Sequence, residues 1–143
     1  MHKVAILEDN VLRQNEMSRV MPLHNVFPIT TFFRTAPGMI QWLQKTDFSS
    51  LSALSLDHDL DPVNGLDPGD GLDVARWLAG QTVRIPVLIH SSNADRAQRM
   101  EWILNDSGFL AYWSPPSPGT DWIEANWIKQ LLKIIETGNQ GRQ

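Results

Sequence analysis

Carboxylates are concentrated in two short segments of this 143-residue sequence. Six aspartates fall within SLDHDLDPVNGLDPGDGLD, residues 55–73, and a Glu8–Asp9 pair follows the apolar run KVAIL. Two unit charges about 4 Å apart repel by roughly 4 kcal/mol at an effective dielectric near 20, so such clusters are costly without a counterion. Because the chain has no cysteine and oxygen donors predominate, the counterion that this chemistry favours is Mg²⁺ or Mn²⁺.

The two acidic segments meet only if the fold brings them to one place. Apolar runs of strand length alternate five times with segments of helical period. The expected strands are KVAIL, ITTFF, LSALSL, IPVLIH and FLAYW, and each precedes a predicted helix. Pro37 is expected to begin the second helix, and Gly80, Gly108 and Gly138 to end the third, fourth and last. This alternation predicts an α/β fold of three αβα layers with a five-stranded parallel sheet.

In a sheet of this kind, ligands bind beyond the carboxyl ends of the strands. The first and third strands deliver carboxylates to that edge, which predicts a metal site made of Glu8, Asp9, Asp57 and Asp59. The fourth strand delivers His90, Ser91, Ser92 and Asn93, and the fifth delivers Ser114 before two prolines.

Other polar and aromatic residues have structural interpretations. His58 directly follows Asp57 and points to the opposite side if strand geometry continues, which favours packing over catalysis. The remaining aspartates of the acidic segment lie in turn and cap sequences, namely Asp61, Asp67, Asp70 and Asp73. Five tryptophans fall on predicted helices and are expected to pack, whereas Trp113 ends the fifth strand and can border a ligand.

Composition narrows the class of protein. Hydrophobic residues make up 42% of the chain, and the net charge is −4 with scattered lysines and arginines, so we expect no DNA-binding domain. The absence of cysteine excludes disulfides and thiolate chemistry. No apolar run approaches the length of a membrane span, and a cytoplasmic location is expected. We predict one domain over residues 1–137 and a polar tail over residues 138–143.

Five segments resemble, in order and spacing, the receiver domain of bacterial response regulators, a flavodoxin-like (βα)5 fold. They are VAILEDNVLRQNEM, LSLDHDLDP, GDGLDVARWL, IPVLIHSSNAD and GFLAYWSPP. The resemblance implies that Glu8 and Asp9 bind Mg²⁺, that Asp57 is the phosphoacceptor of a phosphorelay and that Ser91 is the switch hydroxyl. The family also has a lysine before a proline after the fifth strand. Pro115 takes its place here, beside Ser114, which weakens a prediction of ordinary phosphorelay switching.

Two further departures are similar to a variant group, the cyclic-phosphate-processing receiver domains. The loop after Asp57 carries about eight extra residues, VNGLDPGD, and the fourth strand ends in HSSN. That group is assigned to terminal phosphate chemistry of RNA or nucleotides. The resemblance implies a metal-dependent phosphoesterase acting on a phosphorylated small molecule or an RNA end. Its catalytic residues would be Asp57, His90 and Ser91, and its phosphate-binding residues Ser91, Ser92, Asn93 and Ser114.

Alternatives remain open. A receiver or pseudo-receiver without enzymatic activity would signal through Asp57 or through binding to a signalling protein. LSALSLDHDLD also resembles the nucleophile motif of haloacid-dehalogenase-type phosphatases, but those enzymes place their acidic pair after this strand and not before it. An EF-hand beginning at Asp57 fails, because Pro62 replaces the required glycine and Pro68 the bidentate glutamate.

Overall fold

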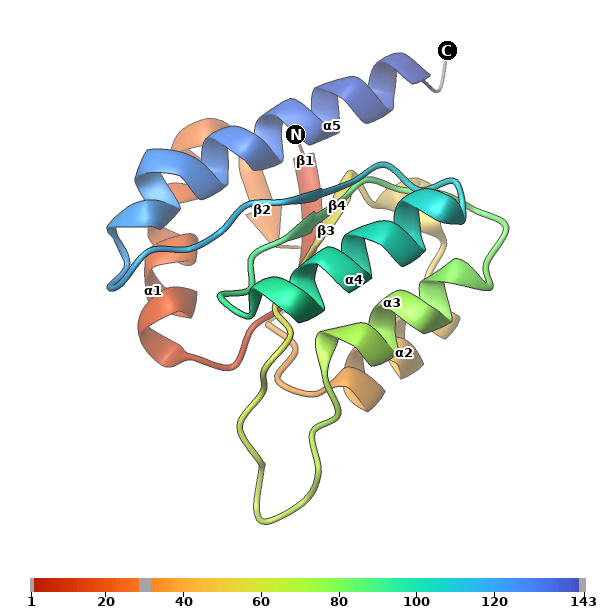
Figure 1. Ribbon diagram of the computed structural model, residues 1–143. Helices are drawn as coiled ribbons and strands as arrows, with labels where there is room; N and C mark the ends of the chain where they lie inside the picture. Colours follow the sequence, from red (N-terminus) through yellow and green to blue (C-terminus); the bar gives the residue numbers. More distant parts are fainter. Residues whose placement is uncertain (1, 29–31, 142–143) are drawn as a thin grey trace.

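The strands follow the predicted alternation and form one parallel sheet. The computed structural model describes residues 2–28 and 32–141, and its sheet has the order β2-β1-β3-β4-β5 (Figure 1). The strands are β1 (His2–Leu7), β2 (Val26–Pro28), β3 (Ala53–Leu56), β4 (Val87–Ile89) and β5 (Ala111–Trp113). This order is that of the flavodoxin-like fold, so the predicted fold class is confirmed.

Helices cover both faces of the sheet, which makes the three layers visible in Figure 1. On one face α1 (Val11–Val20) and α5 (Ile128–Gly141) pack on Val4, Ile6 and Leu88. On the other, Leu54, Leu56 and Ile89 meet three helices, α2 (Ala36–Gln44), α3 (Gly71–Ala79) and α4 (Ala94–Asp106). Short helical turns lie at η1 (Pro22–His24) and η2 (Phe48–Ser50), and a π-helical turn, η3 (Ile123–Trp127), precedes α5.

Polar side chains begin the helices at the carboxyl edge of the sheet. Asn10 caps α1, Thr35 caps α2 and Asn93 caps α4, each accepting a hydrogen bond from a backbone N–H of the first turn. Asp70 and Asp73 form a capping box at the start of α3, which confirms their predicted role as cap residues. Part of the acidic segment is therefore explained by helix initiation.

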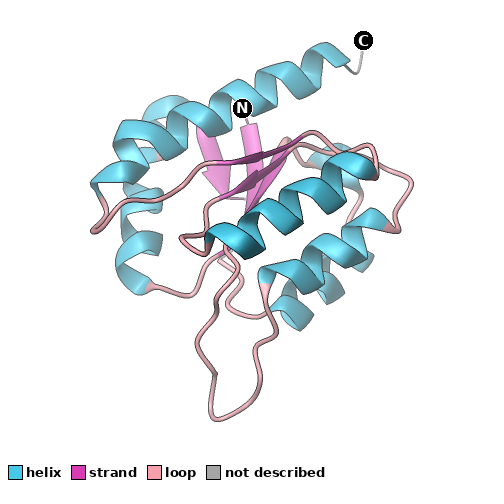
Figure 2. Cartoon of the chain, in the orientation of Figure 1, coloured by secondary structure: helices cyan, strands magenta, loops and turns pink. Residues whose placement is uncertain are grey.

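The segment between β3 and α3 extends away from the domain as a long loop (Figures 1 and 2). Val63 and Leu66 pair across a tight turn in which Asn64 and Gly65 have φ angles of 54° and 75°. Asn-Gly is the favoured sequence for a turn with two positive φ angles. The Asp67 side chain accepts a hydrogen bond from the Gly69 N–H, as predicted for a turn residue.

The element boundaries differ most from the sequence prediction at the second strand and at the end of the last helix. The second strand is Val26–Pro28; residues 29–31 of the predicted ITTFF run lie outside the described residues, and Phe33 of that run bridges Leu7. The predicted end of the last helix at Gly138 is wrong, because α5 continues to Gly141. A Cβ at position 138 would lie 2.4 Å from Cγ of Pro86, so the glycine permits close packing and does not stop the helix.

None of the helices in residues 2–28 and 32–141 has the length and apolarity that a membrane crossing requires.

Candidate functional site

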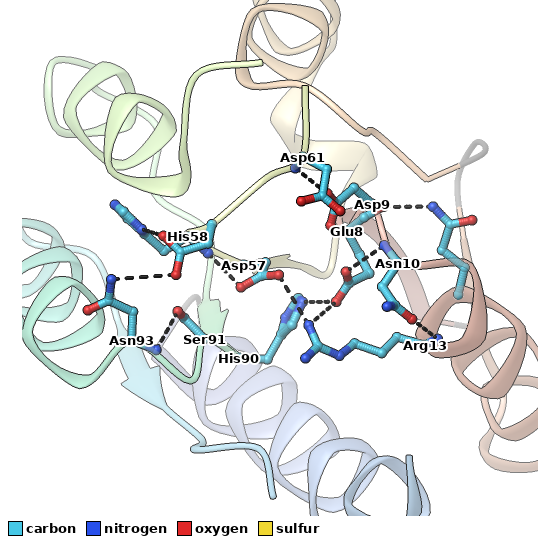
Figure 3. Close-up of polar contacts among 12 residues, drawn as sticks. Glu8, Asp9, Asn10, Arg13, Asp57, His58, Asp61, His90, Ser91 and Asn93 are labelled. Carbon is cyan, nitrogen blue, oxygen red and sulfur yellow. Dashed lines mark hydrogen bonds and ion pairs between the residues drawn. The ribbon is translucent and has the colours of Figure 1, made fainter. Parts of the chain in front are cut away.

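A polar depression lies at the carboxyl ends of β1 and β3, where the sequence predicts ligand binding (Figure 3). Its volume is about 220 Å³, and side chains from three regions line it: Asp9, Asn10, Arg13, Asp57, Asp59, Asp61 and Ser92. Four carboxylates and one guanidinium thus share a small volume. We call this hollow, together with the seven residues that line it, the acidic depression.

Glu8 is completely buried at the end of β1, beneath the acidic depression. Its Oε2 accepts a hydrogen bond from the Asn10 N–H at 3.0 Å, and its Oε1 lies 3.2 Å from His90 Nε2 and 3.6 Å from Arg13 Nη1. Burial alone raises the pKa of Glu8. The hydrogen bond and charge of His90, the Asn10 N–H and Arg13 outweigh burial, so the pKa is lowered and Glu8 stays ionised.

Asp57 lies at the end of β3, with 4% of its surface exposed. The His58 N–H donates to Oδ1 at 2.7 Å, and Arg13 Nη1 lies 3.4 Å from Oδ2. Burial raises the Asp57 pKa to about 6, and Glu8 adds to this, against His90, the His58 N–H and Arg13. Ligand atoms of Asp57, Glu8 and His90 all lie within 4.8 Å of one another, a grouping that can hold a metal ion.

His90 follows β4 and is completely buried. Its Nδ1 lies 2.7 Å from Ser55 Oγ, which also accepts the indole N–H of Trp127 at 3.0 Å. Nδ1 therefore pairs with the Ser55 hydroxyl and Nε2 with Glu8, so both ring nitrogens have a hydrogen-bond partner. Trp122 stacks near the ring, with centroids 6.3 Å apart. His90 therefore contacts Glu8 from below and does not line the acidic depression.

Arg13 occupies the space between the two buried carboxylates. Its side chain is 28% exposed, and Nη1 approaches both Asp57 and Glu8. The guanidinium carbon lies 6.0 Å from the ring centroid of Trp122, within the range of a cation–π contact. Arg13 is the only cationic residue among those that line the acidic depression.

The other two predicted metal ligands also border the acidic depression. Asp9 accepts a hydrogen bond from the Asp61 N–H, and burial is the main cause that raises its pKa. Asp59 is 67% exposed, and its oxygens face His58 Nδ1 at 2.8 Å and Asn93 Nδ2 at 3.5 Å. The four predicted metal ligands are thus neighbours, although the Asp59 side chain points toward Asn93 at the start of α4.

The hydroxyl and amide residues predicted to bind phosphate lie in three places. Ser92 lines the acidic depression, and Ser91 and Asn93 lie on the opposite side of Asp57 from Arg13 (Figure 3). Ser91 is buried, and its Oγ accepts the Asn93 N–H at 3.1 Å. Ser114 instead accepts a hydrogen bond from Asn126 of η3 at 2.8 Å and is not among the lining residues.

His58 and Trp113 support the loops around the site. His58 is buried and points away from Glu8 (Figure 3), with Nδ1 on Asp59 and Nε2 3.5 Å from Asp70 Oδ2. Trp113 donates its indole N–H to the Ser91 carbonyl at 2.8 Å. Both therefore hold the segments that follow β3 and β4.

Sequence reasoning missed Arg13, Ser55 and Trp127. Arg13 has a local signal, because it lies in the first turn of a helix that Asn10 caps directly after the acidic pair. Ser55 and Trp127 have none, because they are 72 positions apart and meet only through packing of η3 on the sheet.

The fold and the acidic strand ends define a receiver domain. The chain is similar to a sensor protein from Polaromonas sp. JS666 (16% identity, TM-score 0.64, covering 95% of this chain and 97% of that one). It is also similar to the receiver domain of the Francisella response regulator 1452 (12% identity, TM-score 0.66, 96% and 98% covered). A third similar structure is the response regulator domain of Thermotoga maritima CheB (7% identity, TM-score 0.69, 95% and 97% covered). At these identities the likeness shows the fold alone.

The model of the cyclic-phosphate processing receiver domain family matches residues 6–106, and the chain belongs to this family. No curated protein matches the chain.

Proposed function

We propose that the protein is a metal-dependent phosphoesterase that processes a cyclic or terminal phosphate of a nucleotide or RNA end. The observation that carries this proposal is the convergence of Glu8, Asp57 and His90 within 4.8 Å, in a chain of the cyclic-phosphate processing family. The proposal places the chemistry in the acidic depression. It includes a cytoplasmic location and a single functional domain.

The donor set fits Mg²⁺ or Mn²⁺, because carboxylate oxygens are the ligands that these hard cations prefer. Asp57, Glu8 and Asp9 would hold the ion, with Asp59 at the more exposed side. When bound, the ion would polarise a phosphoryl oxygen or lower the pKa of a water molecule. His90 keeps one oxygen of Glu8 in place, and both of its nitrogens have partners, so we assign it a positioning role.

The start of α4 supplies the neutral groups of the site. Ser92 offers an exposed hydroxyl at the acidic depression, and Asn93 begins α4 as its cap. Hydroxyls and a helix N-terminus favour an anionic ligand. Ser91 fixes the Asn93 backbone and so sets the shape of this side.

The test is product formation from a panel of 2′,3′-cyclic and linear nucleotide phosphates with Mg²⁺ or Mn²⁺, separated by chromatography. Hydrolysis is expected for the wild type and lost in Asp57→Asn. Asp106→Asn is the matched control, since it removes one exposed aspartate at the far end of α4. An Asp57→Asn protein that cleaves as fast as the wild type would remove the enzymatic claim.

The second candidate is a signalling receiver with Asp57 as phosphoacceptor and a protein as partner. The observation that favours it is the placement of Asp57 at the end of β3, with Oδ1 held by the His58 N–H and Oδ2 facing Arg13. Acetyl phosphate with Mg²⁺ separates the candidates. A stable aspartyl phosphate favours signalling, and its absence favours hydrolysis.

A further inference from the structure

We infer that Arg13 is the phosphate-contacting cation of this site, and that it neutralises Glu8 and Asp57 until a divalent ion takes their oxygens. This inference rests on the proposed function, because it assumes a phosphate ligand in the acidic depression. It assigns to α1 the positive charge that receiver domains otherwise carry after the fifth strand.

The position of Arg13 supports this role. Nη1 lies 3.4 Å from Asp57 Oδ2 and 3.6 Å from Glu8 Oε1, so the guanidinium touches both buried carboxylates. Charge-assisted hydrogen bonds are usually about 2.7–2.9 Å long. Both contacts are longer than that. The guanidinium is therefore shared between the two carboxylates and does not form a short hydrogen bond with either.

The donors of Arg13 are only partly used. The hydrogen bond to Asp57 involves Nη1, while Nε and Nη2 donate no hydrogen bond to another side chain or carbonyl in the part of the chain that the structure describes. A guanidinium presents five N–H donors in a fork that matches two phosphate oxygens. Trp122 packs near the guanidinium and limits the directions in which it can turn. Donors therefore remain for an anion in the acidic depression.

Electrostatics require such a cation. A phosphate entering the acidic depression meets the carboxylates of Asp9, Asp57, Asp59 and Asp61. Each of these negative charges repels the phosphate, and the repulsion is stronger in a partly desolvated site than in bulk water. A divalent ion alone balances only part of this charge.

The fifth strand does not supply the missing charge. Pro115 stands in the lysine position, and the neighbouring Ser114 is held by Asn126 of η3. Arg13 is the only cation among the residues that line the acidic depression. It is therefore the residue placed to contact the phosphate.

The inference predicts opposite effects of one substitution on two ligands. Arg13→Gln removes the competitor for Glu8 and Asp57, so the protein should bind Mg²⁺ more tightly. The same substitution removes a charged hydrogen-bond donor, so the Mg²⁺-loaded protein should bind inorganic phosphate about 10- to 100-fold more weakly. A residue with only a structural role would not produce this pair of opposite changes.

Isothermal titration calorimetry provides the test. Mg²⁺ is titrated into the metal-free protein, and inorganic phosphate is titrated in saturating Mg²⁺, for the wild type, Arg13→Gln and Arg19→Gln. Arg19 is the matched control, because it lies on the same helix, carries the same charge and pairs with Glu16 and Glu124 outside the acidic depression. Circular dichroism establishes that each variant is folded. Arg19→Gln should match the wild type for both ligands.

The expected result is tighter Mg²⁺ binding and weaker phosphate binding in Arg13→Gln. Unchanged phosphate affinity, weaker Mg²⁺ binding or no phosphate binding to the wild type would each overturn the inference. If Arg13→Gln does not fold, Arg13→Lys replaces it in the test. Lysine keeps the positive charge but lacks the paired N–H donors of the guanidinium. A phosphate affinity equal to that of the wild type would overturn the inference. If phosphate binding depends on Arg13 but no substrate is hydrolysed, only the proposed function is refuted. If substrates are hydrolysed but phosphate binding does not depend on Arg13, only the inference is refuted.

Discussion

Asp57→Asn should make the metal-free protein more stable, although it removes a hydrogen-bonded residue from the site. The side chain of Asp57 is 6% exposed and lies beside a second ionised carboxylate, Glu8. Burial raises the Asp57 pKa from its ordinary 3.8 to about 6, after the favourable effects of Arg13 and the His58 N–H are included. The charge on Asp57 is therefore a cost to the folded state.

The size and pH dependence of the effect follow from this pKa. A tenfold change in proton affinity corresponds to about 1.36 kcal/mol, so the full cost is roughly 3 kcal/mol. The cost begins as the pH rises above about 3.8, where the unfolded chain ionises, and is complete once the pH exceeds about 6. Asparagine keeps the oxygen that accepts the His58 N–H but leaves Arg13 with Glu8 alone, so we expect a gain of about 1–3 kcal/mol at pH 8.

The assay is urea denaturation of both proteins in EDTA, followed by tryptophan fluorescence, at pH 8 and pH 4. The gain should be present at pH 8 and should nearly vanish at pH 4. Asp106→Asn is the control and should stay within about 0.5 kcal/mol of the wild type at both values. A loss of more than about 1 kcal/mol in Asp57→Asn at pH 8, or a gain independent of pH, would refute the reasoning.

Three further predictions concern the surroundings of the site and the packing of α5. His90→Ala should lower the free energy of unfolding by about 2–5 kcal/mol, because it leaves a cavity and unpaired buried groups; a loss below about 1 kcal/mol in urea would contradict this. Gly138→Ala should cost about 1–3 kcal/mol, because its Cβ would meet Pro86, whereas Gly80→Ala, with its nearest contact at 3.5 Å, should be nearly neutral; equal melting temperatures would disprove the packing role. Millimolar Mg²⁺ should raise the wild-type melting temperature by mass action, and Asp9→Asn should reduce the shift; identical shifts would exclude Asp9 as a ligand.

The sequence was sufficient to predict the sheet and the edge at which the site lies. Residues 4–7 of KVAIL and 53–56 of LSALSL are buried, and parallel strands end at the same edge, so Glu8 and Asp57 had to be neighbours. Helix caps are equally local signals, because Asp70 and Asp73 lie within one turn of the chain that they cap. These features depend on periodicity and on short spacing.

The remaining features depend on contacts between distant segments. His90 follows a strand directly, yet its orientation is fixed by Ser55 and, through Ser55, by Trp127. Ser114 accepts a hydrogen bond from Asn126, which lies in the π-helical turn before α5, and no residue pattern in that segment signals the turn. A glycine such as Gly138 usually signals the end of a helix. Here a glycine is needed because Pro86, from another part of the chain, packs against this position.

The central claim is that Glu8, Asp9 and Asp57 form a divalent-cation site at the carboxyl edge of the sheet, and Mn²⁺ binding measured by electron paramagnetic resonance tests it most directly. The signal of free Mn²⁺ should decrease on addition of the wild type until one ion is bound per chain. It should decrease equally with Asp106→Asn and should remain that of free Mn²⁺ with Asp57→Asn. Mn²⁺ binding by Asp57→Asn as tight as that of the wild type, or no binding by the wild type, would contradict the account.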